Sequence, residues 1–172
     1  MSELIGVDID GTIANYAFMR DGQTHINHDL AEHLRGNRIA LISNQGGLAF
    51  GLRGLIAKDG VRYPSPTDFY YRFVEIALRL QVQYNIRVES LWVAVHHRSA
   101  NPNDIITVAQ FLRNRLGHYP CYVFTRAESR KPSPLMLNCA GVYCYYGDSP
   151  EDVAAAQKAG IPYVIETRFD VR

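Results

Sequence analysis

The sequence predicts an α/β fold with a mainly parallel sheet and helices on both of its faces. Two observations lead to this prediction. Short apolar runs rich in β-branched residues recur along the chain, and segments with apolar residues at helical spacing separate them. Strands that alternate with helices form parallel sheets, because each helix carries the chain back across one face of the sheet.

Five segments have the composition of strands that are buried on both faces. They are residues 4–9, 38–43, 90–95, 142–147 and 163–167. The first of them, LIGVDI, is apolar almost throughout, as a central strand of a parallel sheet is expected to be.

Helices are predicted between these strands. The segments are residues 67–84, 103–117 and 149–160, with a short helix at 30–35 stopped by Gly36. Residues 67–84 carry apolar side chains every three or four positions, which is the spacing of one helix face. The segment 149–160 begins with Ser-Pro and ends on a glycine, which are typical helix start and stop signals.

The composition is that of one globular domain spanning residues 1–172, with 47% hydrophobic and 20% charged residues. A formal net charge of +1 gives no reason to expect a broad basic surface for nucleic acid or membrane. No apolar run reaches the roughly 18 residues that span a bilayer. The N-terminus lacks a signal-peptide pattern and the three cysteines form no C-x-x-C pair, so we expect a cytoplasmic protein with reduced thiols and no membrane partner.

Polar residues follow three of the predicted strands at their carboxyl ends, where parallel sheets bind ligands. They are Asp8 and Asp10, Ser43 and Asn44, and Asp148 and Asp152. Each ending alone is typical of a turn or of a helix N-terminus. Together they crowd carboxylates that repel one another, a cost that a cation offsets. Hard oxygen ligands favour Mg²⁺ over zinc.

This ordered set of motifs resembles the haloacid dehalogenase (HAD) superfamily of phosphohydrolases. The segment DIDGT at 8–12 is similar to the first motif of that family and Ser43 to the second. Lys131 in RKPSP is similar to the third motif, and GDSPED at 147–152 to the fourth. The resemblance implies a Rossmann-like fold. The interval after the first motif has room for a flap at 13–30, so the cap is expected to be small or absent.

The resemblance also implies roles for single residues. Asp8 would be the nucleophile that forms an aspartyl-phosphate, and Asp10 the general acid and base. Lys131 would neutralise the charge around the phosphate. The implied phosphate contacts are Gly11, Thr12, Ser43 and Asn44, and the implied Mg²⁺ ligands are Asp8, the Asp10 carbonyl, Asp148 and, directly or through water, Asp152. The expected activity is Mg²⁺-dependent hydrolysis of phosphomonoesters.

Two segments, LISNQGGLAFG and RKPSPLML, resemble the subgroup of histidinol-phosphate, heptose-bisphosphate and polynucleotide 3′-phosphatases. Two departures from that subgroup stand out. Phe50 replaces an arginine of the subgroup, which makes Arg53 a candidate for the lost substrate contact. The Cys/His zinc loop before R-K-P is missing, and His96, His97 and His118 are not spaced to replace it. No zinc is therefore expected.

The motifs predict the chemical step but leave the substrate open. The first hypothesis is a small phosphorylated metabolite. The alternative is a nucleic-acid 3′ end, for which the aromatic and arginine-containing segment 61–73 would supply base stacking. A third hypothesis, a non-catalytic binding protein on the HAD fold, is disfavoured because Asp8, Asp10 and Lys131 are all present. Residues 99–130 are interpreted as an insertion beside the site that could cover the pocket, form a dimer contact or pack on the sheet, and packing on the sheet is the default expectation. The oligomeric state is not predicted.

Overall fold

The computed structural model describes residues 3–15, 23–116 and 119–166. Within these ranges an all-parallel sheet of six strands has the order β4-β3-β2-β1-β5-β6. The strands are β1 (Ile5–Val7), β2 (Arg38–Asn44), β3 (Arg87–Ala94), β4 (Cys121–Phe124), β5 (Cys144–Gly147) and β6 (Tyr163–Ile165). The predicted α/β class and its Rossmann-like arrangement are confirmed.

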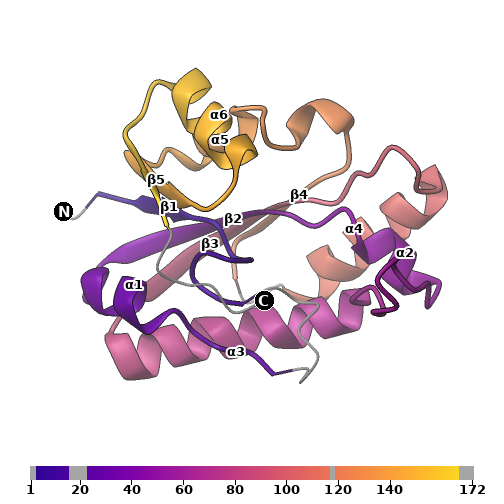
Figure 1. Ribbon diagram of the computed structural model, residues 1–172, viewed down its shortest axis with the longest axis horizontal. Coiled ribbons are helices and arrows are strands. Elements are labelled where there is room, and N and C mark those ends of the chain that lie inside the picture. The colour runs from indigo at the N-terminus through magenta and orange to yellow at the C-terminus, as the bar shows by residue number, and fades with distance from the viewer. Residues whose placement is uncertain (1–2, 16–22, 117–118, 167–172) are drawn as a thin grey trace.

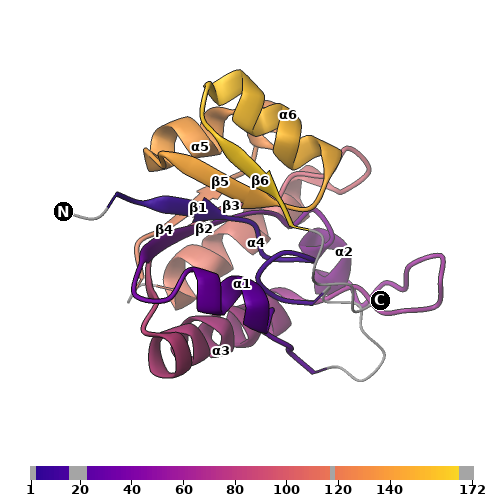
Figure 2. The same ribbon diagram turned by 60° about the vertical axis from the view of Figure 1, so that its left-hand side comes forward.

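Helices cover both faces of the sheet (Figure 1). On one face lie α5 (Leu135–Ala140) and α6 (Pro150–Ala159); on the other lie α1 (His28–His33), α3 (Pro66–Tyr84) and α4 (Pro102–Arg115), with α2 (Leu48–Leu52) beside α4. The turned view in Figure 2 shows the same three layers. Alternation along β2 explains the arrangement, because Ile39 and Leu41 enter the core under α3 whereas Ala40 and Ile42 pack with α5 and α6.

The helix signals in the sequence act as expected. The longest helix, α3, begins with a capping box between Ser65 and Asp68 and ends at Asn85, which has the left-handed φ of 53°. Its predicted apolar face is buried in the core, including Phe69 and Phe73. Helix α6 begins at the predicted Ser-Pro cap. None of the helices in the described residues is both long enough and apolar enough to cross a membrane.

The segment 99–130, for which packing on the sheet was the default expectation, is part of the central fold. Helix α4 packs on the sheet, and β4 pairs with β3 to become the edge strand of the sheet. The strand was not predicted, because CYVF has four residues and an edge strand is only partly buried. Its alternation is therefore weak. The short helices α2 and α5 were not predicted either.

The predicted flap at 13–30 is described in part, and residues 16–22 lie outside the described ranges. The described parts are held against the turn that follows β1. The Asn27 side chain donates to the carbonyl oxygen of Thr12 at 2.9 Å, and the Asn15 side chain donates to the carbonyl oxygen of Gln23 at 2.8 Å. These bonds fix both ends of the segment beside the end of β1.

Candidate active site

The candidate site lies where the sheet reverses its order. The chain builds from β1 out to β4 and then returns to β5 on the other side of β1. Parallel sheets bind ligands outside the carboxyl ends of their strands at such a point. A pocket of about 450 Å³ opens there. Its lining includes six predicted site residues, Asp8, Asp10, Asn44, Lys131, Asp148 and Asp152.

Lys131 is the buried centre of this pocket, with a side chain that is only 3% exposed. Its ammonium group donates to Oδ1 of Asp8 at 3.0 Å and to Oδ1 of Asp152 at 2.6 Å. It also lies within hydrogen-bond distance of the Ile42 carbonyl oxygen (3.1 Å) and the Tyr145 hydroxyl (2.7 Å). The lysine is therefore a fixed positive charge shared between the first and fourth motifs.

Two buried carboxylates share this one cation unequally. Burial acts to raise the pKa of Asp152, but the charge of Lys131 and hydrogen bonds from Lys131 and Tyr145 outweigh it and lower the pKa. Burial raises the pKa of Asp8 well above its usual value; Lys131 opposes this shift, and the charges of Asp152 and Asp10 add to it. Burial would lower the pKa of Lys131, yet its two carboxylate partners raise it. One cation thus compensates the charge of an ionised Asp8 only in part.

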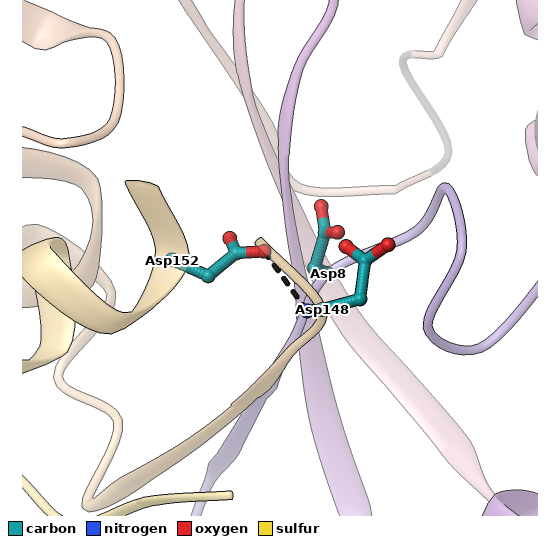
Figure 3. A group of neighbouring side chains, drawn as sticks. All are labelled: Asp8, Asp148 and Asp152. Atoms are coloured by element: carbon teal, nitrogen blue, oxygen red, sulfur yellow. Dashed lines mark hydrogen bonds between the residues drawn. The ribbon is translucent and has the colours of Figure 1, made fainter. Parts of the chain in front are cut away.

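A metal ion would fit beside Asp8, where it would compensate this charge further. Asp8, Asp148 and Asp152 each place one carboxylate oxygen within 4.8 Å of the others. In Figure 3, the side chains of Asp8 and Asp148 lie side by side, and Asp152 approaches from α6. Oδ2 of Asp152 already accepts hydrogen bonds from the backbone N–H groups of Asp148 (3.1 Å) and Ser149 (3.2 Å). Asp8 and Asp148 are therefore the direct ligands that this arrangement offers, and Asp152 holds the backbone of Asp148 in place.

Gly147 makes this approach possible. A Cβ atom at that position would lie 2.4 Å from Cβ of Asp152, so a side chain there would push the first turn of α6 away from β5. The same turn is capped by Ser149, whose hydroxyl lies 2.9 Å from Oδ2 of Asp152. Asp152 therefore serves both the helix cap and the site.

Asp10 is held by two residues, Gln45 and Arg72, that were not among the predicted catalytic, phosphate-binding or metal-binding residues. Nε2 of Gln45 donates to Oδ2 of Asp10 at 2.6 Å and to the Ser43 hydroxyl at 2.8 Å, which ties the first motif to the second. From α3, Nη1 of Arg72 lies 2.9 Å from Oδ1 of Asp10. This contact is an ion pair by distance, without a well-directed hydrogen bond from that nitrogen. Asp10 is thus oriented from both sides.

Thr12 and Gly11 shape the turn after β1. The buried Thr12 hydroxyl donates to Oδ2 of Asp8 at 3.3 Å, and the Gly11 N–H donates to the carbonyl oxygen of Ala14 at 2.7 Å. In this structure, Thr12 supports the carboxylate expected to be the nucleophile.

Ser43 and Asn44 lie at the end of β2, as predicted. Ser43 is buried and faces Gln45, whereas the side-chain amide of Asn44 binds the backbone of Lys131. Asn44 also lines the pocket. Its side-chain amide is thus engaged with the lysine loop, so any phosphate contact from this residue would come from its backbone.

Arg53 does not reach the pocket. It forms two parallel hydrogen bonds with the carboxylate of Asp104 on α4, both 2.9 Å long. The geometry therefore does not support Arg53 as a replacement for the substrate contact that the subgroup's arginine makes. Phe50, which stands where the subgroup has arginine, packs on Tyr63 and His97 with ring centroids 5.1 and 4.9 Å apart.

Arg130 also lines the pocket, although it was not among the predicted site residues. The available signal was its position directly before Lys131 in R-K-P. His96 and His97 lie next to it, at the loop that follows β3. His118, the third histidine considered for zinc, lies outside the described residues.

No protein-family model matches this sequence, and no curated protein is significantly similar to it. The functional assignment therefore depends on the geometry of the site and on the four motifs that resemble HAD phosphohydrolases.

Proposed function

We propose that this protein is a Mg²⁺-dependent phosphomonoester hydrolase that works through an aspartyl-phosphate on Asp8. One observation carries the proposal. Lys131 lies 3.0 Å from Asp8 and 2.6 Å from Asp152, and Asp10 follows two residues after Asp8 at the reversal point of the sheet. A nucleophile, a proton carrier and a fixed cation thus converge on one polar pocket.

In the first step, a carboxylate oxygen of Asp8 attacks phosphorus while the bond from phosphorus to the leaving oxygen breaks. Asp10, as the carboxylic acid, gives its proton to that oxygen. In the second step, Asp10 takes a proton from water as the water oxygen attacks phosphorus. The bond between Asp8 and phosphorus breaks, which releases inorganic phosphate and restores the Asp8 carboxylate.

The carboxylate cluster fits Mg²⁺, with Asp8, Asp148 and the Asp10 carbonyl as ligands and Asp152 holding the backbone of Asp148 in place. When bound, the ion would offset the charge gathered by the phosphate and the carboxylates. Lys131 supplies a further positive charge, 3.0 Å from Oδ1 of Asp8 and 2.6 Å from Oδ1 of Asp152. Gln45 and Arg72 keep the Asp10 carboxylate aimed for proton transfer in both steps.

The primary substrate class is a small phosphorylated metabolite. The alternative, a nucleic-acid 3′ end, is favoured by one observation. A second pocket of about 370 Å³ is lined by Arg62, Tyr63, Tyr71 and Arg72, among others, and Arg72 also contacts Asp10. Tyr71 is 64% exposed, so its ring is accessible for stacking on a base.

Phosphate release from a substrate panel tests the proposal. We expect release by the wild type with Mg²⁺, no release with EDTA, and a loss of about 10³-fold or more in Asp8→Asn. Asp29→Asn, on the exposed side of α1, is the matched control and should keep wild-type activity. Failure of the wild type on sugar, nucleotide, histidinol and oligonucleotide 3′-phosphates would leave the binding-protein hypothesis in its place.

A further inference from the structure

A basic pocket adjoins the proposed catalytic pocket. It has a volume of about 280 Å³ and is lined by His96, His97, Arg98, Ala127 and Arg130. We call these five residues the basic pocket. Ala127 and Arg130 also line the catalytic pocket, so the two cavities share a wall. Among the residues that the structure describes, no carboxylate lines the basic pocket.

Two loops build this pocket and are fastened together. His96 and the two residues after it follow β3, whereas Arg130 comes from the turn before Lys131. Nη1 of Arg130 donates to the carbonyl oxygen of His96 at 3.1 Å. At Gly46, in the loop after β2, a Cβ atom would lie 2.6 Å from that same nitrogen. The loop that carries the second motif therefore packs directly on the basic pocket.

His97 is oriented as a donor. Its Nδ1 accepts a hydrogen bond from the Ser99 N–H at 3.0 Å, so the proton of the neutral ring belongs on Nε2. The edge-on contact with Phe50 holds the ring in place. Burial lowers the pKa of His97, and the charges of Arg130 and Arg98 lower it further, as expected inside an electropositive cavity.

We propose that the basic pocket binds a second phosphate group of the substrate, one that is not hydrolysed. This inference rests on the proposed phosphatase function. Guanidinium groups present paired N–H donors that match phosphate oxygens, and His97 adds a further N–H donor. Because Arg130 borders both cavities, a substrate with two phosphates can place one beside Asp8 and the other on the basic pocket. The second phosphate belongs either to a small bisphosphate or to the diester backbone next to a 3′-phosphate end.

Matched substrate pairs test the inference. One pair is a hexose 6-phosphate and the corresponding 1,6-bisphosphate; the other is a nucleoside 3′-phosphate and a 3′-phosphorylated dinucleotide. For wild type, we expect kcat/KM to be at least about tenfold higher for the member of one pair that carries two phosphate groups, mainly through KM. Arg98→Gln should reduce this ratio several-fold. Arg87→Gln, an exposed arginine at the opposite end of β3, is the matched control and should keep the ratio.

Each outcome decides a different point. A gain confined to the bisphosphate pair supports the inference and identifies small metabolites, whereas a gain confined to the dinucleotide pair supports it and identifies nucleic-acid ends. Hydrolysis with equal kcat/KM in both pairs, or a ratio that Arg98→Gln leaves unchanged, would overturn the inference while the phosphatase function stands. Absence of hydrolysis by the wild type would overturn both.

Discussion

The side-chain amide of Asn44 holds the backbone of Lys131 through two hydrogen bonds. Nδ2 of Asn44 donates to the Lys131 carbonyl oxygen and Oδ1 accepts from the Lys131 N–H, both at 3.0 Å. The end of β2 therefore fixes the loop that carries the buried lysine. Asn44 acts on the site through the position of Lys131.

Asn44→Ala should therefore impair both folding and turnover. Loss of the two bonds is expected to cost about 2 kcal/mol of unfolding free energy, at about 1 kcal/mol each, and to lower kcat about tenfold as the lysine loop loosens. Urea denaturation and steady-state kinetics measure the two effects. A rise in KM with unchanged stability and kcat would instead mean that the side chain binds substrate directly.

Removal of the lysine itself should be far more costly. Lys131→Met leaves Asp8 and Asp152 buried next to each other without their cation, and we expect a loss of about 3–5 kcal/mol of unfolding free energy. The double variant Lys131→Met/Asp152→Asn removes one of the uncompensated charges. It should regain part of the stability and none of the activity. A double variant no more stable than the single one would contradict the shared-cation arrangement.

Asp8 should stabilise the fold when it loses its charge. The raised pKa of Asp8 means that ionisation of its carboxyl group lowers the free energy of unfolding. This loss is absent below the pKa of the unfolded chain, about 3.9, and grows as the pH rises towards the pKa of the folded protein. Above the folded pKa the loss is constant. Asp8→Asn is therefore expected to melt above wild type at pH 7 in EDTA, with a difference that shrinks towards pH 4. Added Mg²⁺ should raise the melting temperature of wild type more than that of the variant.

This expectation fails if Asp8→Asn melts below wild type at pH 7, or if its advantage grows as the pH falls. Either result would mean that Lys131 already compensates the Asp8 charge fully, and it would weaken the case for a metal ion at this site.

Arg72 should affect turnover more than binding. Its guanidinium lies beside Asp10 and also donates to the carbonyl oxygen of Asn15, so Arg72→Ala frees the Asp10 carboxylate on one side. We expect kcat to fall about tenfold with little change in KM. Arg79→Ala on the same helix, where the arginine contacts Thr24 and Glu75, is the matched control and should retain wild-type kcat. Equal losses in both variants would indicate a general effect on α3.

Thiol labelling checks the fold independently of catalysis. Cys139 is exposed on α5, whereas burial raises the pKa of Cys121 on β4 to about 11. At pH 8 the Cys121 thiol is almost entirely protonated and shielded, so iodoacetamide should modify Cys139 much faster. Peptide mass spectrometry over a time course measures the two rates. Equal rates would contradict the placement of β4 in the sheet.

The parts of the site that follow a strand were predictable, and the parts that depend on packing were not. Asp8, Ser43 and Asp148 come directly after or at the end of apolar strands, and parallel strands bring such ends to one edge of a sheet. Arg72 lies on α3, and nothing in local spacing indicates which way that helix aims it. Gln45 had a signal, because it directly follows the predicted pair at the end of β2.

Arg53 shows that closeness in sequence to a motif does not place a residue in the site. Proximity in sequence to the second motif made it a candidate, but the chain turns through α2 and carries it to Asp104 on α4. Strand β4 was missed for a related reason, since Cys121–Phe124 is a short edge strand with one buried residue, Val123. Its place is determined by pairing with β3, which local periodicity does not record.

Detection of a phosphoryl group on Asp8 tests the central claim most directly. An Asp10→Asn variant lacks the base for the second step, so a substrate with a good leaving group should load the enzyme and leave it loaded. Borohydride converts an aspartyl-phosphate to homoserine, which peptide mass spectrometry locates. We expect homoserine at position 8, dependent on Mg²⁺ and absent in Asp8→Asn/Asp10→Asn. Hydrolysis by the wild type with no homoserine at position 8, or with homoserine at another aspartate, would contradict Asp8 as the nucleophile.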